Sequence, residues 1–514
     1  EAAASLGLLL FIILVMVIFG LFVSNSLSTV ALQPLERMLQ VVRERCAEIF
    51  KYTNELEPND KIMEEEEEDN ADNEQTSEFE LLARVIAKLT AIVELSAPNE
   101  PDGEEEMTEN QLIAMNWMQG SRLKRGGTRD RFRRVGSGED SYSLEDCGVA
   151  ELLEVIPVET KLSIDTELFN PVSASTEIRM ALSAFMILSS EGSASWVRNN
   201  VDNANLIQFV AAIASLYPEN PFHNFGHGVD VTWGVFRAMK DIRASRFLPT
   251  SSQFWLLIAS LAHDTGHIGV NNQFLVETSH ELALRYNDHS PLENLHCALL
   301  FQVCNEPEAN IFAKVGKELY KEMRKGMITA ILHTDITKHS EMTKELGMLY
   351  QMNSAAFDSD PTTVLRQSQS NTTLVINALL HFCDISNPMR PWELCCVLAN
   401  LCLDEFFAQG DMEKQLGIPV QMLNDRDKVN RPNSQIGFIE FMIAPFCEVV
   451  VTMFPALDNY AGHLGSNIQK WFEEWKAEGT HPPDAVSKVR SRVDKVTVRC
   501  EQVTRESRGI KVIH

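Results

Sequence analysis

The chain has 514 residues, of which 45% are hydrophobic and 23% charged, so it is globular rather than fibrous or wholly disordered and is too long for one ordinary domain. Its 45 basic and 72 acidic residues give a net charge of −27, which excludes a general nucleic-acid binder. The ten cysteines show no repeated spacing, which excludes a disulfide framework or zinc-finger array and indicates a reducing compartment.

The first feature along the chain is an apolar stretch over residues 2–23, which contains no charged residue. About 20 such residues are enough to span the hydrocarbon core of a bilayer. A secretory signal is disfavoured because no basic segment precedes the stretch, and a buried core helix is disfavoured because no polar face interrupts it. The sequence therefore predicts a transmembrane helix at residues 2–23. The chain begins with Glu1 rather than Met, which indicates part of a longer protein.

Residues 33–147 are predicted to form a juxtamembrane helix followed by a charged, largely disordered linker. Apolar residues between Leu35 and Phe50 recur at spacings of mostly three and four, as on one face of a helix. This helix either pairs with a second copy of the chain, giving a homodimer, or rests on its own domain. Residues 55–80 contain 13 acidic residues and one lysine, and their mutual repulsion prevents a core from forming.

A basic stretch at residues 122–134 contains seven basic residues and one aspartate. It has three possible uses that the sequence leaves open. It can bind anionic lipid at the cytoplasmic face, at ~1 kcal/mol for each basic residue near the surface. It can instead dock on the acidic linker, or it can remain solvated.

The character of the chain changes at residue 148, where long helical patterns begin to alternate with short polar breaks. Strand-like alternation is scarce, and no repeat of 20–50 residues is present. The sequence predicts an all-α fold class, with a compact multi-helix catalytic domain at residues 148–498 and a tail at residues 499–514.

Residues able to bind metal ions gather in this domain, since nine of the thirteen histidines lie between residues 223 and 339. His223 and His227 are four residues apart, so they share a face if this stretch is helical. Two further groups border apolar helices predicted at 254–262 and from about residue 374; in chain order they are His263, Asp264 and His267, and then Asp384.

A lone histidine on an apolar helix is usually a hydrogen-bonded core residue, but three such groups at these spacings indicate a metal centre. Imidazole suits zinc and other transition metals, whereas carboxylate and water suit magnesium or manganese. A carboxylate beside a metal-binding histidine can bridge two ions about 3.5–4 Å apart, which lowers the pKa of a bridging water. The pattern therefore indicates hydrolysis, most naturally of a phosphate ester.

The spacing of these groups resembles that of class I 3′,5′-cyclic nucleotide phosphodiesterases, which are metal-dependent HD hydrolases. The resemblance covers residues 167–477, about 60% of the chain. The motifs that carry it are His223-Asn224-x-x-His227, His263-Asp264-x-x-His267-x-Gly269-x-x-Asn272-x-Phe274, Asp384-Ile385-Ser386-Asn387-Pro388 and Ser434-Gln435-x-Gly437-Phe438-Ile439. Shorter matching blocks include Leu292-Glu293-Asn294, Thr334-Asp335 and Glu405-Phe406-Phe407-x-Gln409-Gly410-Asp411.

The resemblance implies a catalytic role for each motif. It implies two divalent ions: Zn²⁺ in a tight site, and Mg²⁺ or Mn²⁺ in a second site that Asp264 bridges. The implied ligands of the tight site are His227, His263, Asp264 and Asp384. The implied residues that hold water around the second ion are His267, Glu293 and Thr334. A hydroxide activated by both ions would then attack phosphorus.

The remaining implied roles concern proton transfer and the base. His223 would be the general acid that protonates the departing 3′ oxygen, with Glu293 orienting it. Gln435 would hydrogen-bond the purine edge, Phe438 would stack on its face, and Asn387 would line the pocket. The implied product is the 5′-nucleoside monophosphate. A glutamine amide has a donor and an acceptor, so it can read adenine or guanine; the run 424–429 is more similar to the cyclic GMP-selective branch.

Two positions depart from the family pattern. Phe222 stands where tyrosine is usual and loses only a hydroxyl. Gly266 stands where an acid is frequent, which is expected to weaken the second metal site. One alternative from another class is a catalytically impaired HD domain that senses nucleotides or acts as a scaffold at the membrane. Another is an HD hydrolase of different phosphates, which the Gln435 motif disfavours.

Overall fold

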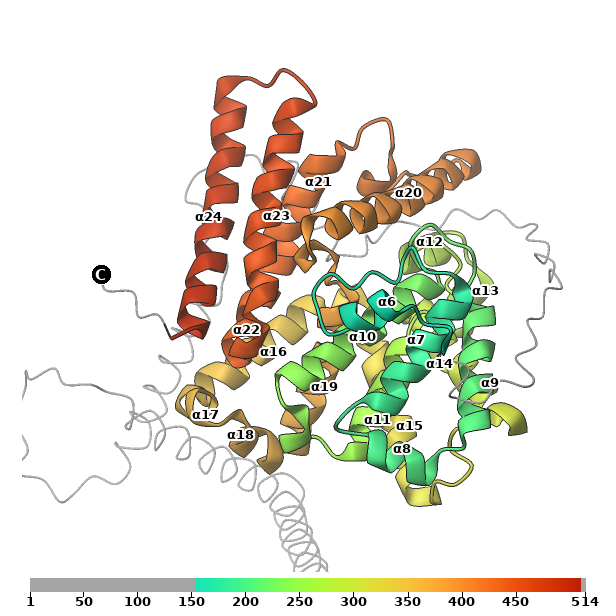
Figure 1. The fold of residues 1–514 in the computed structure, drawn as a ribbon. Coiled ribbons are helices and arrows are strands. Elements are labelled where there is room, and N and C mark those ends of the chain that lie inside the picture. The colour runs from blue at the N-terminus through green and yellow to red at the C-terminus, as the bar shows by residue number, and fades with distance from the viewer. Residues whose placement is uncertain (1–153, 510–514) are drawn as a thin grey trace, which may run out of the picture. The chain divides into compact units, whose positions relative to one another are not determined.

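The structure is a computed structural model that describes residues 154–509, shown in Figure 1. The predicted transmembrane helix at residues 2–23 and the predicted helix and linker at residues 33–147 lie outside the described residues. The basic stretch 122–134, the implied homodimer contact through the juxtamembrane helix and the last five residues of the chain also lie outside them.

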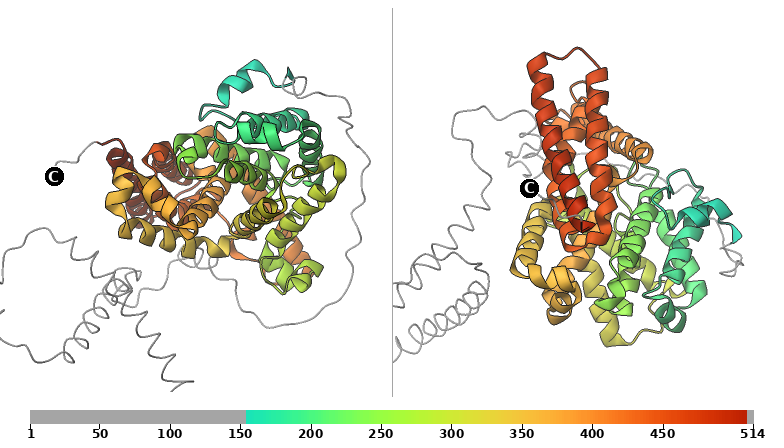
Figure 2. Two further views of the ribbon diagram at one scale, coloured as in Figure 1. Left: turned by 90° about the horizontal axis from the view of Figure 1, so that it is seen from below. Right: turned by 60° about the vertical axis from the view of Figure 1, so that its left-hand side comes forward.

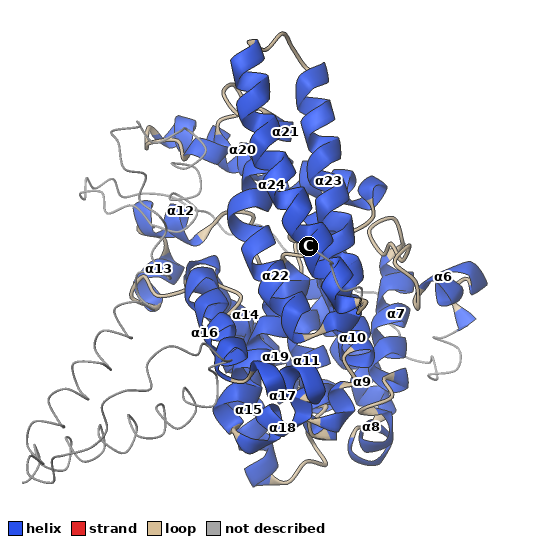
Figure 3. Ribbon diagram, turned by 90° about the vertical axis from the view of Figure 1, so that its left-hand side faces the viewer, coloured by secondary structure: helices blue, strands red, loops and turns tan. Residues whose placement is uncertain are grey.

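The described residues form helices joined by loops and contain no strand, which confirms the predicted all-α fold class (Figure 3). The α-helices are α6 (Val158–Ser163), α7 (Thr176–Ser189), α8 (Ala194–Asn200), α9 (Asn203–Leu216), α10 (Phe225–Asp241), α11 (Thr250–Ala262), α12 (Asn272–Glu277), α13 (Glu281–Arg285), α14 (Pro291–Asn305), α15 (Lys317–Leu332), α16 (His339–Met352), α17 (Ser354–Ser359), α18 (Pro361–Gln367), α19 (Gln369–Asp384), α20 (Trp392–Leu416), α21 (Arg431–Phe438), α22 (Ala444–Met453), α23 (Asp458–Ala477) and α24 (Pro483–Ser507).

Short helices connect several of these elements. They are the 3₁₀ turns η2 (Ala244–Arg246), η3 (Pro307–Ala309), η4 (Ile336–Lys338), η5 (Asn387–Met389), η6 (Met422–Asn424) and η8 (Pro455–Leu457), and the π-helix η7 (Ile439–Ile443) between α21 and α22. A π-helical turn inside a longer helix frequently marks a functional site.

The centre of the domain is built on α10, α11 and α19, whose C-terminal or N-terminal ends carry the motif residues. Every residue of α11 from Gln253 to Ala262 is buried, which explains why this helix is apolar all round. The close packing of α10 on α19 depends on Gly234, because a Cβ there would lie 3.1 Å from the Cβ of Cys383. This packing places the start of α10 near the end of α19.

The C-terminal part of the domain is a long antiparallel pair, α23 and α24, which lies beside α21 and α22 (Figures 1 and 2). Helix α24 continues to Ser507, past the boundary expected at residue 498. Cys500 and Val503 are buried in the main core. The first residues of the expected tail therefore belong to the packed domain, since valine and cysteine recur on one face of α24.

One stretch of the described residues, Arg431–Met453, is long and apolar enough to cross a membrane by length and composition, and 61% of its most apolar window is buried inside the domain. It comprises α21, η7 and α22. Core helices of soluble domains meet the same criteria, and this stretch carries the Gln435 motif. It is therefore a core helix of this domain.

Gly410, near the C-terminal end of α20, permits a close contact with the 3₁₀ turn η6. A Cβ at this position would lie 1.9 Å from the carbonyl oxygen of Asn424. We expect Gly410→Ala to lower the free energy of unfolding by about 1–3 kcal/mol, the usual range for overpacking against groups that cannot retreat. Chemical denaturation of the full chain measures this change.

The matched control is Gly462, an exposed glycine within α23 whose added Cβ would have no atom within 4 Å. Gly462→Ala is expected to be neutral or to stabilise the domain by up to about 1 kcal/mol, since alanine favours helix over glycine. Equal effects at both positions would show that the Asn424 contact is not a constraint.

Candidate active site

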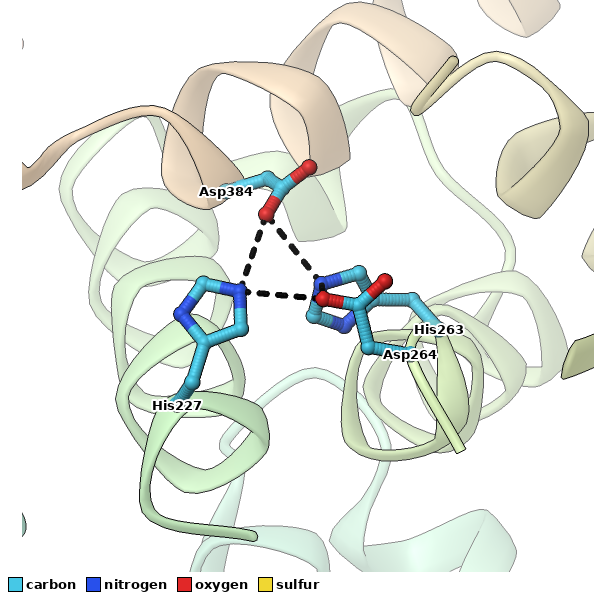
Figure 4. A group of neighbouring side chains, drawn as sticks. All are labelled: His227, His263, Asp264 and Asp384. Atoms are coloured by element: carbon cyan, nitrogen blue, oxygen red, sulfur yellow. Dashed lines mark hydrogen bonds and ion pairs between the residues drawn. The ribbon is translucent and has the colours of Figure 1, made fainter. Parts of the chain in front are cut away.

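Four of the sequence-predicted residues meet at one point of the domain, as Figure 4 shows. His227 lies in the first turn of α10, and Asn224 caps that helix by accepting a hydrogen bond from the Gly226 amide. His263 and Asp264 follow α11 directly, and Asp384 is the last residue of α19. Three helix ends thus bring together side chains that are up to 157 positions apart.

The distances within this group are those of a converging ligand set. Asp384 Oδ1 lies 3.1 Å from the Nε2 atoms of both His227 and His263. Asp264 Oδ2 lies 3.4 Å from His227 Nε2 and 3.2 Å from His263 Nε2. All four ligand atoms lie within 4.8 Å of one another, so a single ion can contact each of them after small side-chain rotations.

The protonation pattern of the group fits a cation. The Nδ1–H of His263 donates to the carbonyl oxygen of Ser260 at 2.8 Å, an arrangement that turns Nε2 toward the site, as in metal-binding histidines generally. Burial opposes a positive charge on His227 and His263, but Asp264 and Asp384 raise the pKa of each. In the described part of the chain, no lysine or arginine pairs with either carboxylate. Two nitrogens and two oxygens suit zinc or a similar transition metal.

Cys383 does not join this group. Its thiol packs toward Gly234 on α10, and burial raises its pKa above the usual range, so a thiolate ligand is disfavoured. The Cys383 thiol thus lies in the packing between α10 and α19, and the role of Asp384 as a metal ligand stays a prediction.

His223 is held by Glu405 rather than by Glu293, so the implied orienting role of Glu293 is wrong. His223 Nδ1 lies 2.5 Å from Glu405 Oε1, and the other carboxylate oxygen accepts the backbone N–H groups of Phe222 and His223 at 3.0 Å. Glu293 instead accepts hydrogen bonds from Asn272 Nδ2 at 2.9 and 3.2 Å. Glu405 comes from α20, which is far along the sequence but passes over the start of α10.

The charges on this pair support a protonated imidazole. Burial tends to lower the pKa of His223, but the carboxylate of Glu405 raises it to about 9. Burial tends to raise the pKa of Glu405, but His223 lowers it to about 2. His223 is therefore a cation at neutral pH, with its other ring nitrogen available as a proton donor.

His267 is neutral and stacks on His223, with ring centroids 4.1 Å apart. Its Nδ1 accepts the Gly269 amide at 3.1 Å, and burial, followed by the charge of His223, lowers its pKa to about 3. The proton of His267 consequently lies on Nε2, where it can donate. His267, His223 and Glu405 form a second group of possible ligand atoms within 4.8 Å.

Glu293 and Thr334 are also buried. Burial, followed by the charge of Asp335, raises the pKa of Glu293 to about 8. The Thr334 hydroxyl donates to the carbonyl oxygen of Ile331 at 2.7 Å, which leaves its oxygen able to accept. The implied role of these residues in holding water stays a prediction.

His296 lies beside Asp264 at the edge of the ligand group, and it was not predicted from the sequence as a site residue. Its Nδ1–H donates to the carbonyl oxygen of Thr265 at 2.8 Å, and burial lowers its pKa to about 4. Its Nε2 is therefore an acceptor, and it faces the carboxylate oxygen Oδ1 of Asp264 at 3.5 Å. Two facing acceptors need a shared donor or cation between them. The signal in the sequence was its position one helical turn after Glu293.

The two departures from the family pattern have structural explanations. The Phe222 ring packs against His227 and His223, with centroids 4.7 and 4.9 Å apart, so the ring is retained without the hydroxyl. Gly266 has a φ of +79°, and an added Cβ would lie 2.3 Å from Leu299 Cδ1. Both the backbone and Leu299 thus disfavour an acidic side chain there.

The residues predicted to contact the base come from two elements. Asn387 begins η5, three residues after Asp384, and is half-buried. Gln435 and Phe438 lie three residues apart on α21 and thus share a face of that helix. Gln435 is buried, and within the described residues its Oε1 has no hydrogen-bond partner. A buried acceptor without a partner is costly, which is consistent with a ligand donor completing it.

Comparison with known proteins agrees with this geometry. A model of the family "3'5'-cyclic nucleotide phosphodiesterase" matches residues 222–464. The human "High affinity cGMP-specific 3',5'-cyclic phosphodiesterase 9A" is 33% identical over 61% of this chain and 50% of its own length. The human "High affinity cAMP-specific and IBMX-insensitive 3',5'-cyclic phosphodiesterase 8A" is 32% identical over 52% of this chain and 34% of its own length. This chain thus spans half or less of the length of these relatives.

Among solved structures, the phosphodiesterase domain of the RhoPDE fusion protein from the choanoflagellate Salpingoeca rosetta is similar, with a TM-score of 0.57 and 26% identity. The likeness covers 62% of this chain and 99% of that domain. A second family model, "RasGEFs all helical domain", matches residues 1–97, which lie outside the described residues.

Proposed function

Because residues 222–464 belong to the 3′,5′-cyclic nucleotide phosphodiesterase family, we propose that this chain hydrolyses 3′,5′-cyclic nucleotides to 5′-nucleoside monophosphates, with cyclic GMP preferred. The observation that carries the proposal is the pairing of a complete ligand group, His227, His263, Asp264 and Asp384, with a separate imidazolium at His223. A module that only binds nucleotides needs no protonated histidine beside a metal centre.

The residues that fit the metal divide into a tight site and its surroundings. His227, His263, Asp264 and Asp384 would hold one divalent ion, proposed to be zinc, and Asp264 would also face a second, proposed to be magnesium or manganese. When bound, such ions polarise phosphoryl oxygens and generate a nucleophile from water at neutral pH. His267, with its proton on Nε2, and the acceptors of Glu293, Thr334 and His296 would orient that water.

His223 acts on the leaving group. Its charged ring donates a proton to the 3′ oxygen as the bond to phosphorus breaks, because an alkoxide is a poor leaving group. Glu405 keeps the ring oriented and charged before the reaction. The purine base of the substrate would be recognised by two residues. Gln435 would accept a hydrogen bond from the base through its unpaired Oε1, and Phe438 would stack on the face of the base.

Preference for cyclic GMP is proposed from two observations. The run at residues 424–429 resembles the cyclic GMP-selective branch, and the relative with 33% identity is named as cGMP-specific. In the described part of the chain, no hydrogen bond fixes the Gln435 side-chain amide. That amide can accept from guanine or donate to adenine by rotating, so turnover of cyclic AMP is expected as well.

Parallel hydrolysis assays of cyclic GMP and cyclic AMP by the purified full chain test the proposal. The expected result is turnover of both that is lost with a chelator and restored by zinc with magnesium, with the larger kcat/KM for cyclic GMP. Binding of both nucleotides without turnover at any metal concentration would favour the sensing or scaffolding alternative.

The pH dependence of kcat/KM tests the role of Glu405. Since the active form of His223 is protonated and its pKa is about 9, activity is expected to fall as the pH rises through that value. In Glu405→Gln the carboxylate charge that raises the pKa of His223 is lost, while the burial that lowers this pKa remains. The alkaline limb of the pH profile should therefore move to lower pH by about 1–3 units. Asp411→Asn, an exposed change on the same helix at the pair with Arg426, should leave the limb in place.

We further propose that the stretch at residues 2–23 anchors the chain in a membrane with the catalytic domain facing the cytoplasm. The apolar length of this stretch supports the proposal. The full chain is expected to stay in the membrane pellet after alkaline carbonate extraction, and a chain starting at residue 31 is expected in the supernatant. Equal extraction of both forms would contradict a transmembrane anchor.

A further inference from the structure

Two buried histidines that the proposed mechanism does not use form a hydrogen-bonded chain behind the site. His339 Nδ1 lies 3.0 Å from His381 Nε2, and His339 Nε2 lies 3.0 Å from the carbonyl oxygen of Met442. The two rings are 3% and 0% exposed. Phe446 packs against both, with ring centroids 5.1 and 5.5 Å away.

The donor and acceptor of each of these hydrogen bonds follow from the last partner, the carbonyl oxygen of Met442. A carbonyl oxygen only accepts, so His339 Nε2 must carry a proton and donate to Met442. Burial lowers the pKa of His339 to about 4, so the ring is neutral and its Nδ1 accepts. His381 Nε2–H therefore donates to His339. His381 Nδ1 remains a buried acceptor without a hydrogen-bond partner among the described residues.

The hydrogen bonds join one element that carries a site residue, α19, to two elements that lie close to site residues along the chain, α16 and η7. His381 lies on α19, three residues before the metal ligand Asp384. His339 begins α16, five residues after Thr334. Met442 lies in the π-helix η7, which directly follows Phe438.

The helical ladder is irregular around Met442. The turn η7 departs from α-helical geometry, and Pro445 at the start of α22 has no N–H to contribute to the helical ladder. The bond from His339 supplies a fixed contact at this interruption. It comes from an element packed on α19 rather than from α21 or α22 themselves, so it fixes one helix against another.

We propose that His339 is a positioning residue that fixes η7, and with it Gln435 and Phe438 on α21, relative to the metal-bearing end of α19. The hydrogen bond from His339 Nε2 to the Met442 carbonyl is the contact that holds η7 in place. His381 only donates a hydrogen bond to the other ring nitrogen of His339. The inference rests on the proposed function in assigning base recognition to Gln435 and Phe438. Loss of the hydrogen bond from His339 to Met442 should lower the affinity for the nucleotide more than it lowers the rate of the chemical step.

The test uses two substitutions of similar size and polarity in the full chain. The terminal amide of glutamine reaches the place of Nε2 and can still donate to Met442, whereas the shorter amide of asparagine reaches only the place of Nδ1. We expect His339→Asn to raise KM for the cyclic nucleotide about tenfold, as for one lost buried hydrogen bond, with kcat changed less than threefold. His339→Gln should restore KM to within about twofold of the parent.

His381→Leu is the matched control, because it removes an equally buried ring but leaves His339 free to donate to Met442. Its KM is expected to stay within about twofold of the parent, although its melting temperature falls. Metal content should be unchanged in all three variants. Equal KM values for the asparagine and glutamine variants, or a KM rise in His381→Leu as large as that in His339→Asn, would overturn the proposal.

An assay without turnover separates this inference from the proposed function. Hydrogen exchange measured by mass spectrometry should be faster over residues 435–446 in His339→Asn and unchanged there in His339→Gln. If the parent hydrolyses no cyclic nucleotide but this exchange pattern appears, the proposed function fails and the positioning role stands. If turnover is present and exchange over 435–446 is the same in both variants, the positioning role fails.

Discussion

Replacement of Asp384 or His263 by alanine is expected to abolish metal binding and cyclic nucleotide hydrolysis together. Each residue supplies one of the four ligand atoms, and Asp384 Oδ1 lies 3.1 Å from the Nε2 atoms of both His227 and His263. Three ligands would not hold an ion with the same geometry, so the metal and any water that it activates would be lost. Activity should fall by more than about 10⁴-fold, since metal, water and substrate orientation are lost at once.

Cys383→Ala is the matched control for Asp384→Ala, because it changes the preceding residue of α19. The thiol packs toward Gly234 and does not belong to the ligand group, so metal content and kcat should stay at the parent values. Elemental analysis of the purified variants, together with turnover assays, measures both quantities. Metal loss in Cys383→Ala, or metal retention with full activity in Asp384→Ala, would contradict the assignment of the ligand group.

His223→Asn is expected to lower kcat by about 10²–10⁴-fold while the metal content stays unchanged. This is the usual contribution of general acid catalysis. The ring contacts Glu405 rather than the ligand group, so its loss should remove the proton donor and leave the metal in place. KM should change much less, because base recognition is assigned to Gln435 and Phe438.

A substrate analogue with an acidic leaving group sharpens this test, since such a group departs without protonation. The analogue should be hydrolysed almost as fast by His223→Asn as by the parent. His227→Asn, four residues further along the sequence, should lose metal and activity on both substrates. If His223→Asn loses metal, or loses equal activity on both substrates, His223 is a ligand or structural residue.

The four ligand residues that the sequence predicted share one physical feature, because each lies in the terminal turn of a helix or directly after its end: His227, His263, Asp264 and Asp384. Helix α11 was predicted at 254–262 and spans Thr250–Ala262, and α19 ends at Asp384 as its pattern indicated. His263, Asp264 and Asp384 lie at or directly after those helix ends. Their positions could therefore be predicted from the helix ends alone.

The residues that were missed or misassigned depend on contacts between distant segments. Glu405 lies 182 positions after His223, and an acidic residue on a long helix is usually solvent-facing. Glu293 was assigned the role of orienting His223 because it lies in the matching block Leu292-Glu293-Asn294. In the structure its carboxylate accepts hydrogen bonds from Asn272 instead. The pairing of His339 with His381 has no local pattern at all, since it arises where α16 packs on α19.

The most direct test of metal-dependent cleavage at this site is hydrolysis of cyclic GMP by the purified full chain in water enriched in ¹⁸O, with Asp384→Ala assayed in parallel. The expected product is 5′-GMP with one ¹⁸O atom on its phosphate, formed by the parent only and dependent on added divalent metal. Formation of 3′-GMP, or the same product yield from Asp384→Ala, would contradict metal-dependent cleavage of the 3′ bond at this site.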